Sequence, residues 1–201
     1  MTIMRGCLHL LLAAGILLLM TVLLRERPPR WVDWQQRSFP VGDGKTAVLE
    51  KRTLKIFSDT DPKQVLWQSE KGWQVQDAFT ADLDLDGEPE VGVLLWKIGR
   101  YGEHRPYWVT EDETVYSQHI FIYDVVRPSG ETEDLAKVLK PIWFASDIGR
   151  EVHSLSLITG EDIPVVALTD EQGEVTHWIW RSFGLKNVEG GTEKIPPADQ
   201  E

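Results

Sequence analysis

Apolar and polar positions divide the chain into one long apolar segment and a series of short runs of mixed polarity. Residues 7–24 read CLHLLLAAGILLLMTVLL, in which His9 and Thr21 are the only polar side chains. A helix of this length, rising about 1.5 Å per residue, just crosses the hydrocarbon core of a bilayer. We therefore expect a transmembrane helix or uncleaved signal anchor over residues 7–24, after a short flank at residues 1–6.

The residues that follow this segment favour its retention as an anchor. A cleavable signal peptide ends in small residues with an A-x-A-like pattern, whereas Leu24 is followed by Arg25, Glu26 and Arg27. The excess of arginine on this side favours a cytoplasmic domain, but a short N-terminus, an apolar run and then a globular domain are typical of exported bacterial proteins. We expect a single-pass protein of the cell membrane with an extracytoplasmic domain.

Beyond a linker at residues 25–45, the pattern changes to short runs rich in β-branched and aromatic residues, separated by turn-forming residues. This pattern predicts an all-β domain over residues 46–188, followed by a polar, flexible tail at residues 189–201. The predicted strands are residues 46–57, 65–68, 73–80, 91–97, 119–126, 141–145, 152–158, 165–168 and 177–182.

A weak internal repeat connects the two halves of this domain. Residues 54–57 and 65–69 (LKIF, VLWQS) match residues 120–123 and 141–146 (IFIY, PIWFAS), and in both copies an alternating strand and a Val-rich strand follow. A third, partial copy begins with HWIWRSFGL at residues 177–185. Repeats of one multi-stranded sheet each are typical of β-propellers, although a closed propeller has at least about four blades. We expect a partial β-propeller-like array or a sandwich of antiparallel sheets, built from about two degenerate repeats.

Charge and cysteine content argue against several functions. The formal charge of −11, from 32 acidic and 21 basic residues, repels phosphate backbones, so we expect no nucleic acid partner. The single cysteine, Cys7, lies inside the apolar segment, which leaves the domain without a disulfide or a thiol nucleophile. Ser117 and His119 lie close in sequence to Asp112 and Asp124, but no G-x-S-x-G motif accompanies them. We expect a non-enzymatic domain.

The strongest local signal is the segment DLDLDGEPE at residues 82–90, with acidic residues at positions 1, 3, 5 and 9 and glycine at position 6. Calcium takes about six to eight oxygen ligands, and alternating positions of a tightly curled loop direct carboxylates at one point while glycine allows the sharp turn. Leu83 and Leu85 would then point into the core. The predicted ligands of a single Ca²⁺ are the side chains of Asp82, Asp84, Asp86 and Glu90 and the backbone carbonyl of Glu88.

This segment is not an EF-hand, because position 12 of the loop is Val93 and the preceding residues alternate like a strand. Over residues 78–95 it resembles the calcium loop of FG-GAP and VCBS-type repeats, which has the pattern D-x-[DN]-x-D-G-x-x-[DE] followed by a hydrophobic strand. The resemblance implies an integrin-type, propeller-like module for extracytoplasmic recognition or structure. The second copy at residues 158–163 has no ladder of acids, so we expect one site. The alternative is that Asp86-Gly87 is an ordinary hairpin turn whose neighbouring acids are solvated.

Tryptophan is abundant, with nine residues in the chain. We expect most of them to fill the core, because they fall inside predicted strands, and we expect Trp31 and Trp34 to lie at the membrane interface. The long segment after residue 100 is different, since its aromatic residues lie outside the predicted strands. The candidate binding surface there consists of Tyr101, His104, Tyr107 and Trp108.

These observations predict a non-enzymatic, membrane-anchored β domain in which one calcium ion stiffens a loop beside a recognition surface. Its partners would be the membrane, through the N-terminal helix, and an unknown protein or carbohydrate ligand. One alternative is a cell-envelope enzyme or accessory acting on carbohydrate, with an acidic residue of the segment 101–112 as acid or base. Another alternative is a structural subunit that completes its incomplete set of repeats by self-association.

Overall fold

The structure is a computed structural model that describes residues 27–101, 107–126, 138–145, 148–158 and 163–188. The flank and apolar segment at residues 1–24, the tail at residues 189–201 and His104 lie outside these ranges. Within the described ranges, no helix is long and apolar enough to span a bilayer. The transmembrane helix stays a prediction.

The described residues form three four-stranded antiparallel sheets, each made of four strands that are consecutive in the chain. The N-terminal sheet contains β1 (Arg37–Pro40), β2 (Lys45–Glu50), β3 (Thr53–Ser58) and β4 (Val65–Gln68). The central sheet contains β5 (Gln74–Ala81), β6 (Glu90–Ile98), β7 (Tyr116–Val125) and β8 (Leu139–Ala145). The C-terminal sheet contains β9 (Val152–Ile158), β10 (Val165–Asp170), β11 (Val175–Arg181) and β12 (Gly184–Asn187). The prediction of an all-β fold of antiparallel sheets is confirmed.

The internal repeat of the sequence corresponds to equivalent strands of successive sheets. Its first copy covers β3 to β6 and its second copy covers β7 to β10, so each matched pair of strands has the same position within its own sheet. The partial third copy falls on β11 and β12. The sheets number three rather than two, because two half-repeats at the ends of the domain supply the remaining strands.

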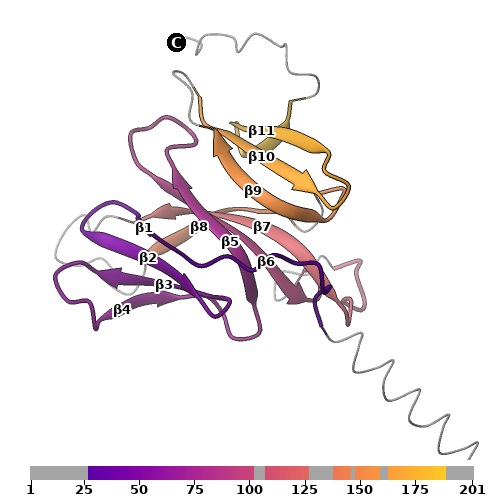
Figure 1. Ribbon diagram of the computed structural model, residues 1–201, viewed down its shortest axis with the longest axis horizontal. Coiled ribbons are helices and arrows are strands. Elements are labelled where there is room, and N and C mark those ends of the chain that lie inside the picture. The colour runs from indigo at the N-terminus through magenta and orange to yellow at the C-terminus, as the bar shows by residue number, and fades with distance from the viewer. Residues whose placement is uncertain (1–26, 102–106, 127–137, 146–147, 159–162, 189–201) are drawn as a thin grey trace, which may run out of the picture.

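The central sheet lies between the other two, and both of its faces are buried (Figure 1). Side chains alternate between the faces along β6, as the pleat of a strand requires. Val93 and Leu95 pack into the cluster shared with the N-terminal sheet, whereas Leu94 packs into the cluster shared with the C-terminal sheet. This arrangement explains why β6 reads as an almost continuous apolar run.

A buried hydrogen-bond network joins the central sheet to β9. Gln118 donates from Nε2 to the Val152 carbonyl at 2.7 Å, and its Oε1 accepts from the Val152 N–H at 2.6 Å. Gln76 donates from Nε2 to the carbonyls of Val152, at 3.2 Å, and His153, at 2.8 Å. The Oε1 of Gln76 accepts from Trp96 Nε1 at 2.8 Å and from Gln118 Nε2 at 2.7 Å. Two side-chain amides thus bind the backbone of β9 much as a neighbouring strand would.

One glycine permits an unusually close contact between the central and C-terminal sheets. A Cβ atom at Gly184, the first residue of β12, would lie 2.2 Å from Nε1 of Trp143 on β8. The Trp143 indole can therefore pack against the backbone of β12 only because residue 184 has no side chain.

The predicted strand at residues 46–57 is wrong in one respect, because it is the hairpin of β2 and β3. Glu50 pairs with Thr53, and the two turn residues, Lys51 and Arg52, have positive φ angles of 50° and 64°. Such turns usually carry Asn or Gly, so a Lys-Arg pair gives no turn signal in the sequence.

The stretch expected as a linker carries β1, and Val32 and Val41 in the same stretch are buried. Arg37 of β1 forms an ion pair with Asp77 of β5, at 2.8 Å between Nε and Oδ1. Asp77 is buried, and burial raises its pKa to about 6 even though Arg37 lowers it. The sequences of β1 and β12, RSFP and GLKN, contain no β-branched residue, so neither was predicted as a strand, whereas β4, of the same length, contains Val65 and Trp67.

Most tryptophans fill the core as predicted. Trp96 is fully buried, and five others that pack against the two hydrophobic clusters are Trp67, Trp73, Trp143, Trp178 and Trp180. Trp31 and Trp34, expected at the membrane interface, contact the domain. The Trp31 ring packs edge-on against Trp96 at 5.8 Å, and the Arg52 guanidinium lies 4.1 Å from the centre of the Trp34 ring.

Candidate metal centre and aromatic segment

The acid loop, residues 82–89, joins β5 to β6 at one end of the central sheet. The strand ladder closes at the pair Ala81 and Glu90. Asp86-Gly87 therefore lies within a longer loop and is not the two-residue turn of a tight hairpin. The other part of that alternative, in which the neighbouring acids are solvated and hold no ion, stays a prediction. Pro89 packs against the β1–β2 turn. A Cβ atom added to Gly42 of that turn would lie 3.1 Å from Pro89 Cγ.

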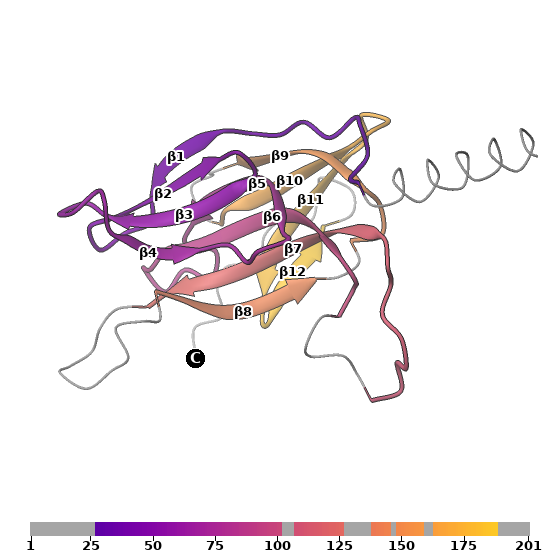
Figure 2. The same ribbon diagram turned by 90° about the horizontal axis from the view of Figure 1, so that it is seen from below.

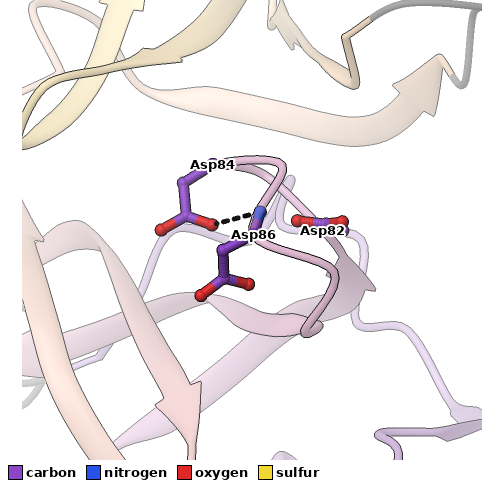
Figure 3. Close-up of side chains that lie close together, drawn as sticks. All are labelled: Asp82, Asp84 and Asp86. Atoms are coloured by element: carbon purple, nitrogen blue, oxygen red, sulfur yellow. Dashed lines mark hydrogen bonds between the residues drawn. The ribbon is translucent and has the colours of Figure 1, made fainter. Parts of the chain in front are cut away.

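The aspartates of the acid loop curl its backbone by accepting hydrogen bonds from it. Asp84 Oδ1 accepts from the N–H of Asp86 at 3.3 Å (Figure 3). Asp86 Oδ1 accepts from the N–H of Glu88 at 2.8 Å. Asp82 Oδ2 accepts from the N–H of Gly87 at 3.0 Å. Gly87 has a φ of 91°, a conformation that favours glycine. The alternation of Asp with other residues is therefore what shapes the loop.

The three aspartates converge. One carboxylate oxygen from each of Asp82, Asp84 and Asp86 lies within 4.8 Å of the others. Asp82 Oδ1 is buried and has no hydrogen-bond partner within the described residues. Burial raises the pKa of Asp84, and the charges of Asp86, Asp82 and Asp124 raise it further. The centre thus concentrates negative charge that no cationic side chain of the acid loop itself offsets.

Glu90, another predicted ligand, is not one of the three residues whose carboxylate oxygens converge, and the predicted role of the Glu88 backbone carbonyl stays a prediction. Glu90 is 2% exposed and its Oε2 accepts from the N–H of Leu83 at 2.6 Å, so that it closes the base of the loop. Burial raises the pKa of Glu90 to about 7, with the charges of Asp84, Asp86 and Asp124 adding to the effect.

Asp124 is the residue that sequence reasoning missed at this centre. It stands on β7 directly opposite Glu90, and its charge acts on both Glu90 and Asp84. Lys140 approaches Asp124 at 3.7 Å. No local motif marks Asp124, because only the register of β6 with β7 brings it to the acid loop.

The two leucines of the acid loop behave differently. Leu83 is 1% exposed and belongs to the cluster between the central and C-terminal sheets, as predicted. Leu85 is 48% exposed, and its φ of 64° turns the chain away from the alternation of a strand. The prediction that Leu85 enters the core is wrong.

The aromatic segment, described at residues 99–101 and 107–115, joins β6 to β7 at the other end of β6. Tyr107 and Trp108 are 94% and 69% exposed, and their rings contact each other edge-on at 4.9 Å. Tyr101 is 37% exposed, and His104 lies outside the described residues. Because β6 has nine residues, about 30 Å separates this segment from the acid loop. The expectation that the loop adjoins the candidate binding surface is wrong, since they occupy opposite ends of one strand.

Asp112 and the Ser117–His119 pair were considered for catalysis, and each makes contacts within the fold. Asp112 accepts hydrogen bonds from the backbone N–H groups of Arg100, at 2.7 Å, Tyr101, at 3.2 Å, and Glu113, at 2.8 Å. These bonds hold the turn of the segment together, which is a different task from proton transfer to a substrate.

Ser117 and His119 contact each other, with 2.9 Å between Oγ and Nε2. His119 is completely buried, and its Nδ1 has no hydrogen-bond partner within the described residues. Burial lowers its pKa to about 4, and the charges of Lys97 and Arg100 lower it further. A triad requires a third group on the second ring nitrogen, and the described part of the chain supplies none there.

Comparison with known proteins adds no assignment to this geometry. No protein-family model matches the chain, and neither the curated proteins nor the solved structures show a match to it.

Proposed function

We propose that this chain is a single-pass membrane protein whose extracytoplasmic β domain is not catalytic and holds one calcium ion in the acid loop. The observation that carries the proposal is the convergence of Asp82, Asp84 and Asp86 within 4.8 Å, together with a buried Asp82 oxygen that has no partner within the described residues. A hard cation with oxygen ligands would satisfy that oxygen and offset the repulsion of the carboxylates.

The loop's own hydrogen bonds support a preformed site. Each of the three aspartates uses one oxygen to accept a backbone N–H, which fixes the carboxylate and leaves the other oxygen for an ion. Glu90 would act as a second layer that holds the loop base through Leu83. The Glu88 carbonyl and Asp124 are the further oxygen donors that the surroundings offer.

The proposal includes the partial β-propeller-like array that the family resemblance implies. Three successive four-stranded sheets, with the middle one covered on both faces, are what a partial β-propeller-like array of FG-GAP or VCBS type would contain. The acid loop, ordered by its ion, would present the exposed Leu85 and its neighbours to an unknown protein or carbohydrate ligand.

The test is thermal unfolding of the full chain in mild detergent, first with EDTA and then with calcium or magnesium. Free calcium at a hundred times its Kd should stabilise the domain by about 2.7 kcal/mol, because the ion binds only the folded state. The variant Asp84→Ala, Asp86→Ala should show no such gain. A matched control, Glu50→Ala with Glu171→Ala, removes the same charge at exposed positions elsewhere and should respond like the unmodified protein. A calcium response retained in the Asp84, Asp86 variant would disprove the site.

A further inference from the structure

The described domain begins close to the end of the predicted membrane segment. Leu24 is three residues before Arg27, and three extended residues reach at most about 11 Å. From Trp31 onward the chain is held by the domain, since Trp31 packs on Trp96 and Val32 is 5% exposed. The end of the domain that carries Arg27 must therefore face the bilayer if residues 7–24 cross it.

The aromatic segment lies at this same end of the molecule. Residues 27–30 share a surface hollow with Arg52, Gln74 and Tyr116, and Tyr116 is the first residue of β7, directly after the aromatic segment. Figures 1 and 2 show the indigo start of the described chain and the connection from β6 to β7 at one end in both views. The acid loop lies at the opposite end of β6.

Exposed apolar side chains are concentrated on this segment. Tyr107 and Trp108 stand at 94% and 69% exposure, and Ile98 and Val115 at its base stand at 50% and 39%. The Gly99 N–H donates to the Val115 carbonyl at 3.4 Å, which brings the two ends of the base together. Tyrosine and tryptophan are the side chains that favour the headgroup region of a membrane, because one part of each is apolar and another can bond to water.

We propose that the Tyr107–Trp108 pair docks in the headgroup region of the membrane from which the chain emerges, as a second contact beside the anchor. The inference rests on the proposed transmembrane helix. Two contacts with one membrane would stop the domain from swinging about its short connection, and would hold the acid loop about 30 Å from the segment, on the far side of the domain. The attraction comes from aromatic burial rather than charge, since the formal charge of the chain is −11.

The experiment measures whether lipid reaches this segment. The full chain, with Cys7→Ser and Thr110→Cys, is labelled with a fluorophore and reconstituted into phosphatidylcholine vesicles that contain a headgroup-level spin-labelled lipid. Thr110 is exposed and leaves Tyr107 and Trp108 intact. The matched control carries the label through Lys63→Cys, an exposed turn residue of the N-terminal sheet. Strong quenching is expected at position 110 and none at position 63, and the quenching at 110 should be lost when Tyr107→Ser and Trp108→Ser are added.

The outcomes separate the docking from the anchor. If the chain fails to float with the vesicles, the proposed anchor is wrong and the docking is wrong with it. If the chain floats but position 110 is quenched no more than position 63, the anchor stands and the docking is overturned. A label at 110 that is open to aqueous iodide and unaffected by the spin-labelled lipid would leave the segment free for a protein or carbohydrate, and would also overturn the docking.

Discussion

The central sheet has two buried faces that are held by different kinds of contact. The face toward the N-terminal sheet packs through a cluster of apolar side chains contributed by β2, β3 and all four strands of the central sheet. The face toward the C-terminal sheet has a comparable cluster, but it adds the buried amides of Gln76 and Gln118, which bind the backbone of β9.

This difference separates stability from orientation. Apolar burial is proportional to area and has no direction, so it holds two sheets together in several relative positions. Hydrogen bonds from Gln118 to both the N–H and the carbonyl of Val152 are satisfied in one position only. The C-terminal sheet is therefore positioned by polar contacts, and the N-terminal sheet by packing and by the ion pair of Arg37 on β1 with Asp77 on β5.

Substitutions at two adjacent residues of β6 test the difference between the two faces, and they should have the largest effect on stability. Leu94 and Leu95 are both completely buried and face opposite sheets. Leu94→Ala and Leu95→Ala should each lower the free energy of unfolding by about 3 kcal/mol in urea denaturation, because each leaves a cavity. Hydrogen exchange should accelerate mainly in β9 to β12 for Leu94→Ala and in β1 to β4 for Leu95→Ala. The same exchange pattern in both variants would show that the two faces do not act separately.

Removing the amide of Gln118 gives the next largest effect. Gln118→Leu keeps most of the side-chain volume but leaves the N–H of Val152 without its acceptor. We therefore expect the free energy of unfolding to fall by about 2 kcal/mol. Exchange of the Val152 amide should become faster than in the unmodified protein. Gln68→Leu, on the exposed end of β4, is the control and should change little. An unchanged free energy for Gln118→Leu would mean that apolar packing alone positions the C-terminal sheet.

The buried His119, whose ring contacts Phe121 on the face toward the N-terminal sheet, gives a pH-dependent effect. Its pKa is lowered to about 4 in the folded domain, against about 6.5 when unfolded, so the unfolded chain binds the proton first. Stability from this residue is complete above pH 6.5 and is lost as the pH falls toward 4. The free energy of unfolding at pH 7 minus that at pH 5 should be more positive, by about 1–2 kcal/mol, in the unmodified protein than in His119→Gln.

Comparison with His119→Gln is needed because two buried carboxyl groups act in the opposite direction. The pKa values of Asp77 and Glu90 are raised to about 6 and about 7, so both groups stabilise the folded state as the pH falls. Equal pH dependence in the two proteins would show that His119 is not held neutral.

The smallest effect concerns the hairpin of the N-terminal sheet. Lys51 has a φ of 50°, which asparagine adopts more readily than lysine. Lys51→Asn should raise the free energy of unfolding by about 0.5 kcal/mol, whereas Lys55→Asn, within β3, should not. A loss of stability from Lys51→Asn would mean that the lysine side chain contributes more than the turn geometry suggests.

Much of the fold could be predicted from local patterns. Val65 to Gln68 and Val152 to Ile158 were predicted with the bounds that β4 and β9 have, and the acid loop was located by its spacing alone. The hairpin at Lys51 and Arg52 could not be found, because neither residue is a turn former and only the surrounding strands hold them at positive φ.

In the acid loop, too, some features follow from the local sequence and others from the surrounding structure. Its three aspartates converge because each one bonds to backbone only a few residues ahead, which is a property of the local sequence. Glu90 leaves the predicted cluster because the strand ladder begins there and buries its side chain. The exposure of Leu85 likewise follows from the turn that the aspartates impose.

The sequence by itself determined most of the strands, the repeat that relates equivalent strands and the curl of the acid loop, since these depend on side-chain alternation and on contacts between near neighbours. Only the tertiary structure decided that Asp124 faces Glu90, that Gln118 binds the backbone of β9, and that the acid loop and the aromatic segment stand at opposite ends of β6. These relations depend on strand register and sheet packing, which join residues far apart in the chain and leave no mark in any short stretch of it.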